Sequence, residues 1–479
     1  MLFNSYVYIF LFLPVVLLIY FVLNKNKLIQ LSKGWLVLAS LFFYSWWNIK
    51  YLPLILCSML FNYSIGTTLN NYENTKLKIN RKFILVFGIT ANLLLLGYYK
   101  YFDFFLKNTN LLFRSHIEIL NIILPLGISF FTFTQIAYLV DAYKKTVKEA
   151  DFLNYALFVT FFPHLIAGPI LHHSEMMPQF SNLKNKIFSH KNLALGIFLF
   201  SIGLFKKTVL ADTLSGFVND GYNIAHSLNF FESWLVSISY AMQIYFDFSG
   251  YTDMALGAAL IFNINLPINF NSPYKAHNIQ DFWRRWHITL SRFLRDYIYI
   301  PLGGNRLGDF KKYQNLFTTF VLGGIWHGAN WTFVIWGMLH GIGSIIHSLF
   351  RKLNLKMPVF LAVTLTFIFV NFTWVFFRAG NLHTALSMIH NMVGLNGFQL
   401  PKIFHGHLRL DHINTLDFLD PTNAIYTIIL SFILLFTQNS MELVRKFKPS
   451  ILIALVTSIL LLISISALCQ PSEFLYFNF

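Results

Sequence analysis

The feature that most constrains the fold is a series of apolar runs, each close to the length that crosses a lipid bilayer. A helix rises 1.5 Å per residue, so roughly 20 apolar residues span the hydrocarbon core. The clearest runs are residues 6–23, 83–99, 119–140, 193–205 and 451–468. With the weaker runs between them, they predict about eleven or twelve membrane helices. Only 12% of the residues are charged, about half the fraction of a soluble protein. The sequence therefore predicts an all-α polytopic membrane protein.

The basic residues indicate topology. The formal charge of +16 is concentrated in short gaps between apolar runs. These gaps contain Lys25, Lys27, Lys33, Lys76, Lys78, Arg81, Lys82, Lys144, Lys145, Lys148, Arg351, Lys352 and Lys356. Loops rich in Lys and Arg are typical of the cytoplasmic face, so this placement argues against nucleic acid as a partner. The two cysteines, Cys57 and Cys469, provide neither a disulfide framework nor a metal cluster.

No internal repeat is evident, and we expect residues 1–479 to form a single membrane-embedded domain. The longest polar interruption is the stretch 381–423, which we expect to form an extracytoplasmic loop because it has few basic residues. Its five histidines are His383, His390, His405, His407 and His412. Their irregular spacing is unlike that of a zinc site, so we assign no metal.

Polar and ionisable residues inside apolar context are candidates for function, because burying them in a membrane is costly. One group lies between Gln243 and Asn271, where Asp247 and Asp253 stand six residues apart. The pair could be an acid site. Alternatively, each carboxylate holds an arginine of the following segment, and we favour this second interpretation because buried charges need partners.

That following segment is 280–306. As a continuous helix it would place Trp283, His287, Leu290 and Leu294 on one face, with most of the arginines elsewhere. This pattern is typical of a helix at the membrane interface. His287 is then either functional or a packed core residue. Arg284, Arg285 and Arg292 are available for an anionic ligand.

The most informative segment is 322–331, which interrupts an apolar stretch, 316–346, that is too long for one crossing. We expect a break at His327. Gly323, Gly324 and Gly328 would let backbone or substrate approach closely. Trp326 and Trp331 flank the imidazole, and desolvation would keep it neutral and able to accept a proton as a general base. The alternative is a histidine that only packs between helices.

A second break is expected at 163–169, where two prolines and a glycine interrupt an apolar run. Such a break is tolerated where the freed backbone groups are buried in protein or line a cavity, although a simple helix end explains it too. The sequence contains no nucleophile elbow, no phosphate-binding loop and no His-Glu-x-x-His pair. Hydrolase, ATPase and zinc-protease activities therefore lose their usual support.

Several motifs resemble those of the membrane-bound O-acyltransferases. They are Gly-Ile-Trp-His-Gly-Ala-Asn-Trp around His327, Phe-Trp-Arg-Arg-Trp-His-Ile-Thr-Leu-Ser around His287, and Tyr-Phe-Asp-Phe-Ser-Gly-Tyr-Thr-Asp-Met around Asp247. The resemblance extends over nearly the whole chain, to 129–143, 162–170, 372–378 and the aromatic end 474–479. Within the family it is strongest to bacterial proteins that O-acetylate alginate or peptidoglycan. His164 is a departure, because relatives often have glutamine at this position.

The resemblance implies a ring of membrane helices around a tunnel, with additional interfacial and re-entrant helices. It implies that His327 is the catalytic histidine and that His287, the second family-marked residue, also belongs to the catalytic site and lines its donor side. The donor would be acetyl-coenzyme A or another acyl thioester, with no tightly bound cofactor. We expect Asn330, Trp326, Trp331, the three arginines and the two aspartates to contact the substrates. The location would be the bacterial inner membrane, and a periplasmic or extracellular acetyltransferase would receive the acyl group. The acceptor polymer stays open.

Two other classes of protein stay possible on the sequence alone. A transporter or flippase for acyl groups or lipid-linked sugars would also have broken apolar segments with polar residues at mid-membrane. We find no matching pair of broken segments in the two halves, which counts against it. A structural membrane subunit is the other alternative, and the dense polar segments count against that.

Overall fold

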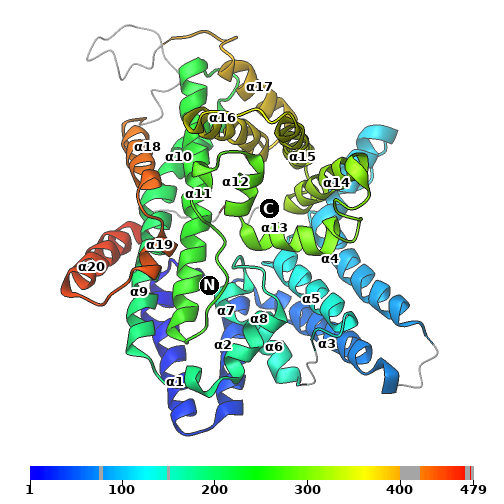
Figure 1. The fold of residues 1–479 in the computed structure, drawn as a ribbon, viewed down its shortest axis with the longest axis vertical. Coiled ribbons are helices and arrows are strands. Elements are labelled where there is room, and N and C mark those ends of the chain that lie inside the picture. Colours follow the sequence, from blue (N-terminus) through cyan, green and yellow to red (C-terminus); the bar gives the residue numbers. More distant parts are fainter. Residues whose placement is uncertain (75–78, 148–150, 400–420, 470–474, 476–479) are drawn as a thin grey trace. The chain divides into compact units, whose positions relative to one another are not determined.

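The computed structural model describes residues 1–74, 79–147, 151–399, 421–469 and 475, and this part contains helices and no strand. The all-α prediction is confirmed (Figure 1). The chain divides into two compact units, the first formed by residues 1–201, 251–267 and 448–457 and the second by 202–250, 268–447 and 458–479. A single domain and a ring around a tunnel stay predictions.

The first unit is built mainly from the N-terminal helices. They are α1 (Leu13–Lys25), α2 (Ile29–Ser45), α3 (Leu52–Asn70), α4 (Arg81–Phe113), α5 (Ile128–Tyr143), α6 (Phe152–Thr160), α7 (Phe162–Leu165) and α8 (His173–Ser181). Three longer helices have residues in both units: α9 (His190–Phe205), α11 (Phe230–Ile261) and α20 (Ile451–Ser466).

The second unit contains the helices that carry most of the candidate site residues. They are α10 (Asp212–Asn223), α12 (Ile279–Arg285), α13 (Ile288–Leu294), α14 (Gly308–His327), α15 (Trp331–Lys352), α16 (Val359–Arg378), α17 (Leu382–Met392), α18 (Pro421–Phe436) and α19 (Ser440–Arg445). Several of these helices begin at a residue whose side chain caps the first turn. For example, the side chain of Asn278 caps α12, and Asn439 with Glu442 forms a capping box on α19.

Six helical segments among the described residues are long and apolar enough to cross a membrane. They are Tyr8–Lys25, Ile49–Asn70, Arg81–Phe113, His190–Asn223, Trp331–Lys352 and Val359–Arg378. Two shorter apolar helices are Asn423–Phe436 and Ile451–Ser466. Four of the five clearest apolar runs are thus helical as expected. The total of eleven or twelve crossings stays a prediction.

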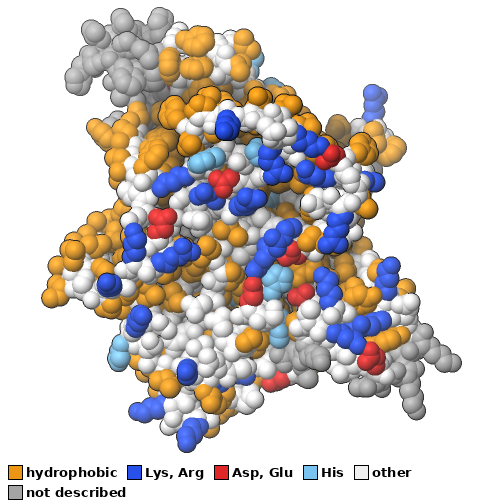
Figure 2. Space-filling model, viewed as in Figure 1, with side chains coloured by type: hydrophobic (Ala, Val, Ile, Leu, Met, Phe, Trp, Pro, Cys, Tyr) orange, Lys and Arg blue, Asp and Glu red, His pale blue; other side chains and the backbone are white. Residues whose placement is uncertain are grey.

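Large apolar side chains on several of these helices are exposed. Leu18 on α1, Leu94 on α4 and Phe360 on α16 each expose more than 60% of their surface. Figure 2 shows hydrophobic side chains covering α20 as well. Monomeric soluble proteins rarely expose apolar patches of this extent, and here the exposed side chains are what a lipid bilayer would cover.

The fifth run, 119–140, is not one membrane helix, and the prediction was wrong there. Residues 114–124 are not helical, and the helix begins only at Ile128. Gly127 has a φ of +67° and packs against the backbone of Leu165 and Ile166. With Pro125 just before it, this turn stops a helix from running through the apolar run.

The stretch expected to be an extracytoplasmic loop begins with a helix. Asn381 caps α17, which carries the exposed His383 and His390. Residues 400–420, including His405, His407 and His412, lie outside the described residues. On which side of the membrane this stretch lies stays a prediction.

Candidate active site

The break expected at His327 is present. Helix α14 ends at His327, α15 begins at Trp331, and the two helices pack against each other along their length as a hairpin. Glycines make the close approach possible: a Cβ added to Gly324 would lie 2.4 Å from the Phe333 carbonyl oxygen and 3.0 Å from the Gly337 Cα. The prediction of close backbone approach is therefore confirmed for Gly324, whereas Gly323 and Gly328 lie against the side chains of Leu294 and Phe333.

His327 lies among aromatic rings. Its imidazole is 4% exposed and makes edge contacts with Trp326, Trp336 and Phe377, at centroid distances of 4.9, 5.0 and 5.0 Å. It is also the last residue of α14. The carbonyl end of a helix carries partial negative charge and stabilises a cation placed there. A proton that His327 accepts is thus stabilised by its own helix.

The environment of His327 differs in part from the expected one. Trp326 is in contact, and the second indole packed on the imidazole is Trp336, whereas Trp331 is 54% exposed. Asn330 lies three residues after His327, but α14 ends at His327, so the two residues do not share a helical face. It caps α15 in an extended conformation, accepting from Thr332 N and donating to Gly380 O at 2.7 Å. Substrate contact by Trp331 or Asn330 stays a prediction.

The segment 280–306 is broken into short helices, so the expected continuous helix was wrong. His287 separates α12 from α13 with a φ of +43°. The cause is Asn269 in the preceding segment. Its backbone carbonyl accepts from Ile288 N at 3.0 Å, and its side-chain oxygen accepts from Thr289 N and Thr289 Oγ1 at 3.1 and 2.7 Å. These bonds cap α13 and bend the chain at His287.

The same asparagine orients the His287 ring. His287 is fully buried, its Nδ1 lies 3.4 Å from Asn269 Oδ1, and its ring makes an edge contact with Phe248 at 4.8 Å. An amide oxygen can only accept, so His287 carries its proton on Nδ1 when this bond is made. The Nε2 atom is then the one that can accept a proton or a hydrogen bond.

The surroundings of the two histidines meet in one tryptophan cluster. Trp374 on α16 contacts Trp286 next to His287 at 4.9 Å and stacks on Trp336 at 5.9 Å, and Trp336 in turn contacts His327. Trp286, the sequence neighbour of His287, and Trp336, which contacts His327, therefore belong to one buried aromatic cluster of the second unit.

Sequence reasoning missed His340 on α15. This residue is fully buried, accepts at Nδ1 from Trp283 Nε1 at 3.2 Å, and has Nε2 3.0 Å from Thr373 Oγ1. An indole N–H can only donate, so His340 is a neutral tautomer protonated on Nε2. Thr373 passes the hydrogen bond on to Val370 O at 2.7 Å. His340 thus ties α12 and α16 to α15. A histidine between Leu339 and Gly341 in an apolar helix offered no sequence signal for this.

The three arginines are placed differently from one another. Arg284 is exposed and Arg292 is half-buried. Arg285 forms an ion pair with Asp281, with 2.9 Å between Nε and Oδ1, and also reaches the Asn271 carbonyl at 3.4 Å. An ion pair four residues apart on α12 mainly stabilises that helix. Binding of an acyl donor by the three arginines stays a prediction.

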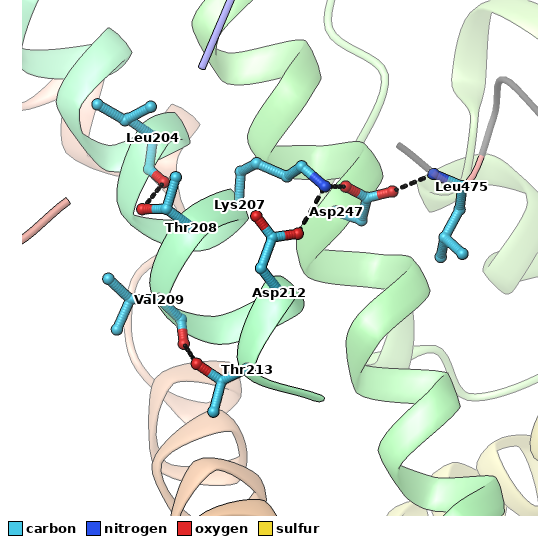
Figure 3. A network of polar contacts seen from close by, with 8 residues as sticks. All are labelled: Leu204, Lys207, Thr208, Val209, Asp212, Thr213, Asp247 and Leu475. Carbon is cyan, nitrogen blue, oxygen red and sulfur yellow. Dashed lines mark hydrogen bonds and ion pairs between the residues drawn. The ribbon is translucent and has the colours of Figure 1, made fainter. Parts of the chain in front are cut away.

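The carboxylate of Asp247 holds a lysine rather than an arginine, so the favoured interpretation was wrong for this residue. Lys207 Nζ lies 2.7 Å from an oxygen of Asp247 and 2.7 Å from one of Asp212 (Figure 3). The second Asp247 oxygen accepts from the backbone N–H of Leu475 at 3.0 Å. All three charged side chains are at least 95% buried. Asp253 is also buried on α11, and contact of either aspartate with substrate stays a prediction.

The break at 163–169 lies wholly within the first unit and is buried, as expected of freed backbone groups. Helix α7 is a single turn, and His164 Nε2 lies 2.9 Å from the Phe158 carbonyl. Gly168 packs directly over His164, where an added Cβ would lie 2.4 Å from the His164 Cα. His164 therefore stabilises this turn. Among the described residues, no group of three or more His, Cys, Asp or Glu is placed to hold a metal ion.

Comparison with known proteins adds independent information. The model of the membrane-bound O-acyltransferase family matches residues 40–384, which include both histidine sites. The chain is 49% identical to a peptidoglycan O-acetyltransferase of Helicobacter pylori, over 100% of this chain and 98% of the relative. It is 38% identical to a probable alginate O-acetylase of Pseudomonas aeruginosa, over 87% of this chain and 79% of the relative. It is 29% identical to a teichoic acid D-alanyltransferase of Bacillus subtilis, over 66% of this chain and 82% of the relative.

Proposed function

The chain belongs to the membrane-bound O-acyltransferase family, as its motifs indicated, and from this premise we propose that it moves an acetyl group across the membrane for O-acetylation of an exported polysaccharide. It is a multi-pass membrane protein and an O-acyltransferase. The proposal adds the donor, a cytoplasmic acetyl thioester such as acetyl-coenzyme A, and the location, a bacterial inner membrane. The observation that carries it is the buried His327 at the break between α14 and α15.

His327 is proposed as the general base. A hydroxyl of the acceptor gives its proton to the imidazole as its oxygen attacks the thioester carbonyl carbon. The carbon–sulfur bond then breaks, and the proton moves from His327 to the departing thiolate. The position of His327 at the carbonyl end of α14 stabilises the transient imidazolium. The aromatic rings around it exclude water, which would otherwise hydrolyse the thioester.

His287 is proposed to orient the reactants. With its proton held on Nδ1 towards Asn269, its Nε2 can accept a hydrogen bond from a hydroxyl. Arg284 and Arg292 are proposed to meet the donor's phosphates, because guanidinium groups bind phosphate by charge-assisted hydrogen bonds. Arg285 contributes less, since Asp281 already neutralises it.

The acceptor proposed first is a peptidoglycan-type glycan. The relative whose name states peptidoglycan is 49% identical along the whole chain, whereas the relative whose name states alginate is 38% identical over 87% of it. A partner acetyltransferase outside the membrane is proposed to receive the acyl group and pass it to the polymer.

The experiment compares O-acetyl content of cell-wall glycan in a deletion strain complemented with wild type, His327→Ala or His383→Ala. His383 is an exposed histidine on α17 and serves as the matched control. Loss of a general base lowers rates by about 10²–10⁴-fold, so His327→Ala should restore no measurable acetylation while the other two restore it fully. Restoration by His327→Ala at equal membrane abundance would refute the catalytic assignment. If even wild type restores no glycan acetylation, the proposed acceptor is wrong, and acetylation of other surface polymers should be measured next.

A further inference from the structure

A cavity of the first unit, remote in sequence from the histidine sites, has the features of a lipid site. It has a volume of about 1160 Å³ and lies between α1 and the segment 183–190. Its wall is mostly apolar, including Leu18, Val22, Ile187 and Phe188, and its polar lining includes Lys25, Lys27 and Lys186. No Asp or Glu is among its described lining residues. The cavity thus combines a mostly apolar wall with three lysines and no acidic residue among its described lining.

Two of these lysines lie at the end of a membrane helix. Lys25 is the last residue of α1, and Lys27 follows in the turn to α2. Figure 2 shows lysine and arginine side chains gathered where α1 and α2 join. Helix ends with clustered lysines lie at the headgroup level of the cytoplasmic leaflet, while the apolar residues before them face the acyl chains. The lysines and the apolar wall of the cavity therefore match the two parts of a phospholipid.

The opposite wall is held in a fixed conformation. Asn263 Nδ2 donates to the carbonyl oxygens of Asn185 and Ile187, at 2.8 and 2.9 Å, and so fixes the backbone on both sides of Lys186. Asn192 Nδ2 donates in turn to Asn263 Oδ1 at 2.8 Å. The backbone that carries Lys186 is thereby fixed in advance of any ligand, which lowers the entropic cost of binding.

A further lysine, Lys33, lies close enough to Lys186 to repel its charge. Lys33 is buried and donates to the neutral side-chain oxygen of Asn154 at 2.7 Å. Burial, together with the charge of Lys33, lowers the pKa of Lys186 from its usual value. An anion bound at Lys186 would reduce the repulsion between the ammonium groups of Lys186 and Lys33.

Ile187 and Phe188 support a lipid rather than a soluble anion. They are 69% and 40% exposed, directly after Lys186, in a segment that is not a long helix. Exposed apolar side chains next to a lysine suit acyl chains and would not help to bind free phosphate.

From these observations we propose that an anionic phospholipid of the cytoplasmic leaflet occupies this cavity, with its phosphate at Lys25, Lys27 and Lys186 and an acyl chain along Leu18, Val22 and Ile187. The site is separate from the proposed acyl transfer and does not depend on it.

The test uses the full-length protein reconstituted in phosphatidylcholine bilayers that contain spin-labelled phosphatidylglycerol or spin-labelled phosphatidylcholine. The relative association constant of the two probes is measured for wild type and for the triple variant Lys25→Gln, Lys27→Gln and Lys186→Gln. A matched control removes three exposed lysines outside the cavity, Lys82, Lys184 and Lys191.

Wild type should prefer the anionic lipid, and each lysine removed from the cavity should lower that preference by about fivefold, the equivalent of about 1 kcal/mol per basic residue. The control variant should keep the preference. Equal losses in both variants would show a general surface attraction and overturn the site.

Two further measurements test the lipid site if the triple variant misfolds. Leu18→Trp leaves all lysines in place and fills the groove, so it should reduce binding of both lipid probes. An unchanged affinity in this variant would overturn the role of the groove. Competition with inorganic phosphate should leave the lipid bound, whereas displacement by millimolar phosphate would identify a free-anion site instead.

Discussion

Removing the charge of Lys207 should destabilise the protein strongly. Lys207 is 1% exposed and lies 2.7 Å from carboxylate oxygens of both Asp212 and Asp247, so one positive charge balances two negative ones in a buried site. Replacing it by methionine keeps the length of the side chain and leaves both carboxylates unbalanced. Removal of one partner from a buried ion pair costs about 3–5 kcal/mol, because the remaining charge has lost its solvent and its counter-charge.

The distribution of charge predicts an order among variants. Asp212→Asn leaves a neutral pair of Lys207 with Asp247 and can keep a hydrogen bond through the amide oxygen. Among the single variants of the cluster it should therefore lose the least free energy of unfolding, about 1 kcal/mol. The neutral triple variant, Lys207→Met with Asp212→Asn and Asp247→Asn, should recover most of the stability that Lys207→Met loses. Replacing a complete buried charge cluster by neutral groups is often nearly neutral in free energy.

The same series should affect activity. Asp247 is followed on α11 by Phe248, whose ring packs on His287. A displaced α11 would therefore move His287, and polysaccharide O-acetylation should fall in Lys207→Met and return in the triple variant. Stability is measured by denaturant unfolding of purified protein in detergent, and acetylation is measured in complemented cells. If Lys207→Met unfolds at the same denaturant concentration as wild type, Lys207 does not balance the charges of Asp212 and Asp247 in a buried cluster.

Three other substitutions test the proposed site. Gly324→Ala should destabilise the hairpin by about 1–3 kcal/mol and abolish acetylation, because its Cβ meets the backbone of α15. Stability is measured by thermal unfolding in detergent, and Gly34→Ala, at a position with open space, is the control. Asn269→Leu should lower the rate of acetyl transfer with little change in donor KM, because it releases the His287 ring, and a large rise in KM alone would contradict this. His340→Phe should destabilise the protein by about 1–3 kcal/mol, since Trp283 N–H stays buried without its acceptor; unchanged unfolding would show that water replaces the imidazole.

The sequence allowed a good prediction of the hairpin that carries His327. An apolar stretch that is too long for a single membrane helix must be interrupted, and the glycines on both sides of one histidine indicate where the interruption lies. Local sequence was sufficient here because the break and the close packing both depend on residues within a few turns of His327.

The other parts of the site depend on contacts between distant segments, and local sequence does not encode them. The bend at His287 is imposed by Asn269, eighteen residues earlier, against a helical pattern in the segment itself. Lys206 and Lys207 directly follow an apolar run and resemble the start of a basic loop, yet Lys207 is buried against a residue forty positions away. His340 owes its role to an indole donor on α12.

Both family-marked histidines stand at ends of helices, and this placement distinguishes their proposed roles. At the carbonyl end of α14, His327 is neutral at rest because it is buried, and the helix end offsets part of the cost of a positive charge, which suits a residue that takes up a proton only transiently. His287 precedes the first turn of α13, where the helix N-terminus disfavours a positive charge, and Asn269 holds its proton on Nδ1. A neutral, oriented imidazole is suited to accepting a hydrogen bond and is poorly suited to storing a proton. His327 is therefore the proposed base and His287 the proposed positioning residue. The reverse assignment would need His287 at the carbonyl end of a helix and His327 at the amino end.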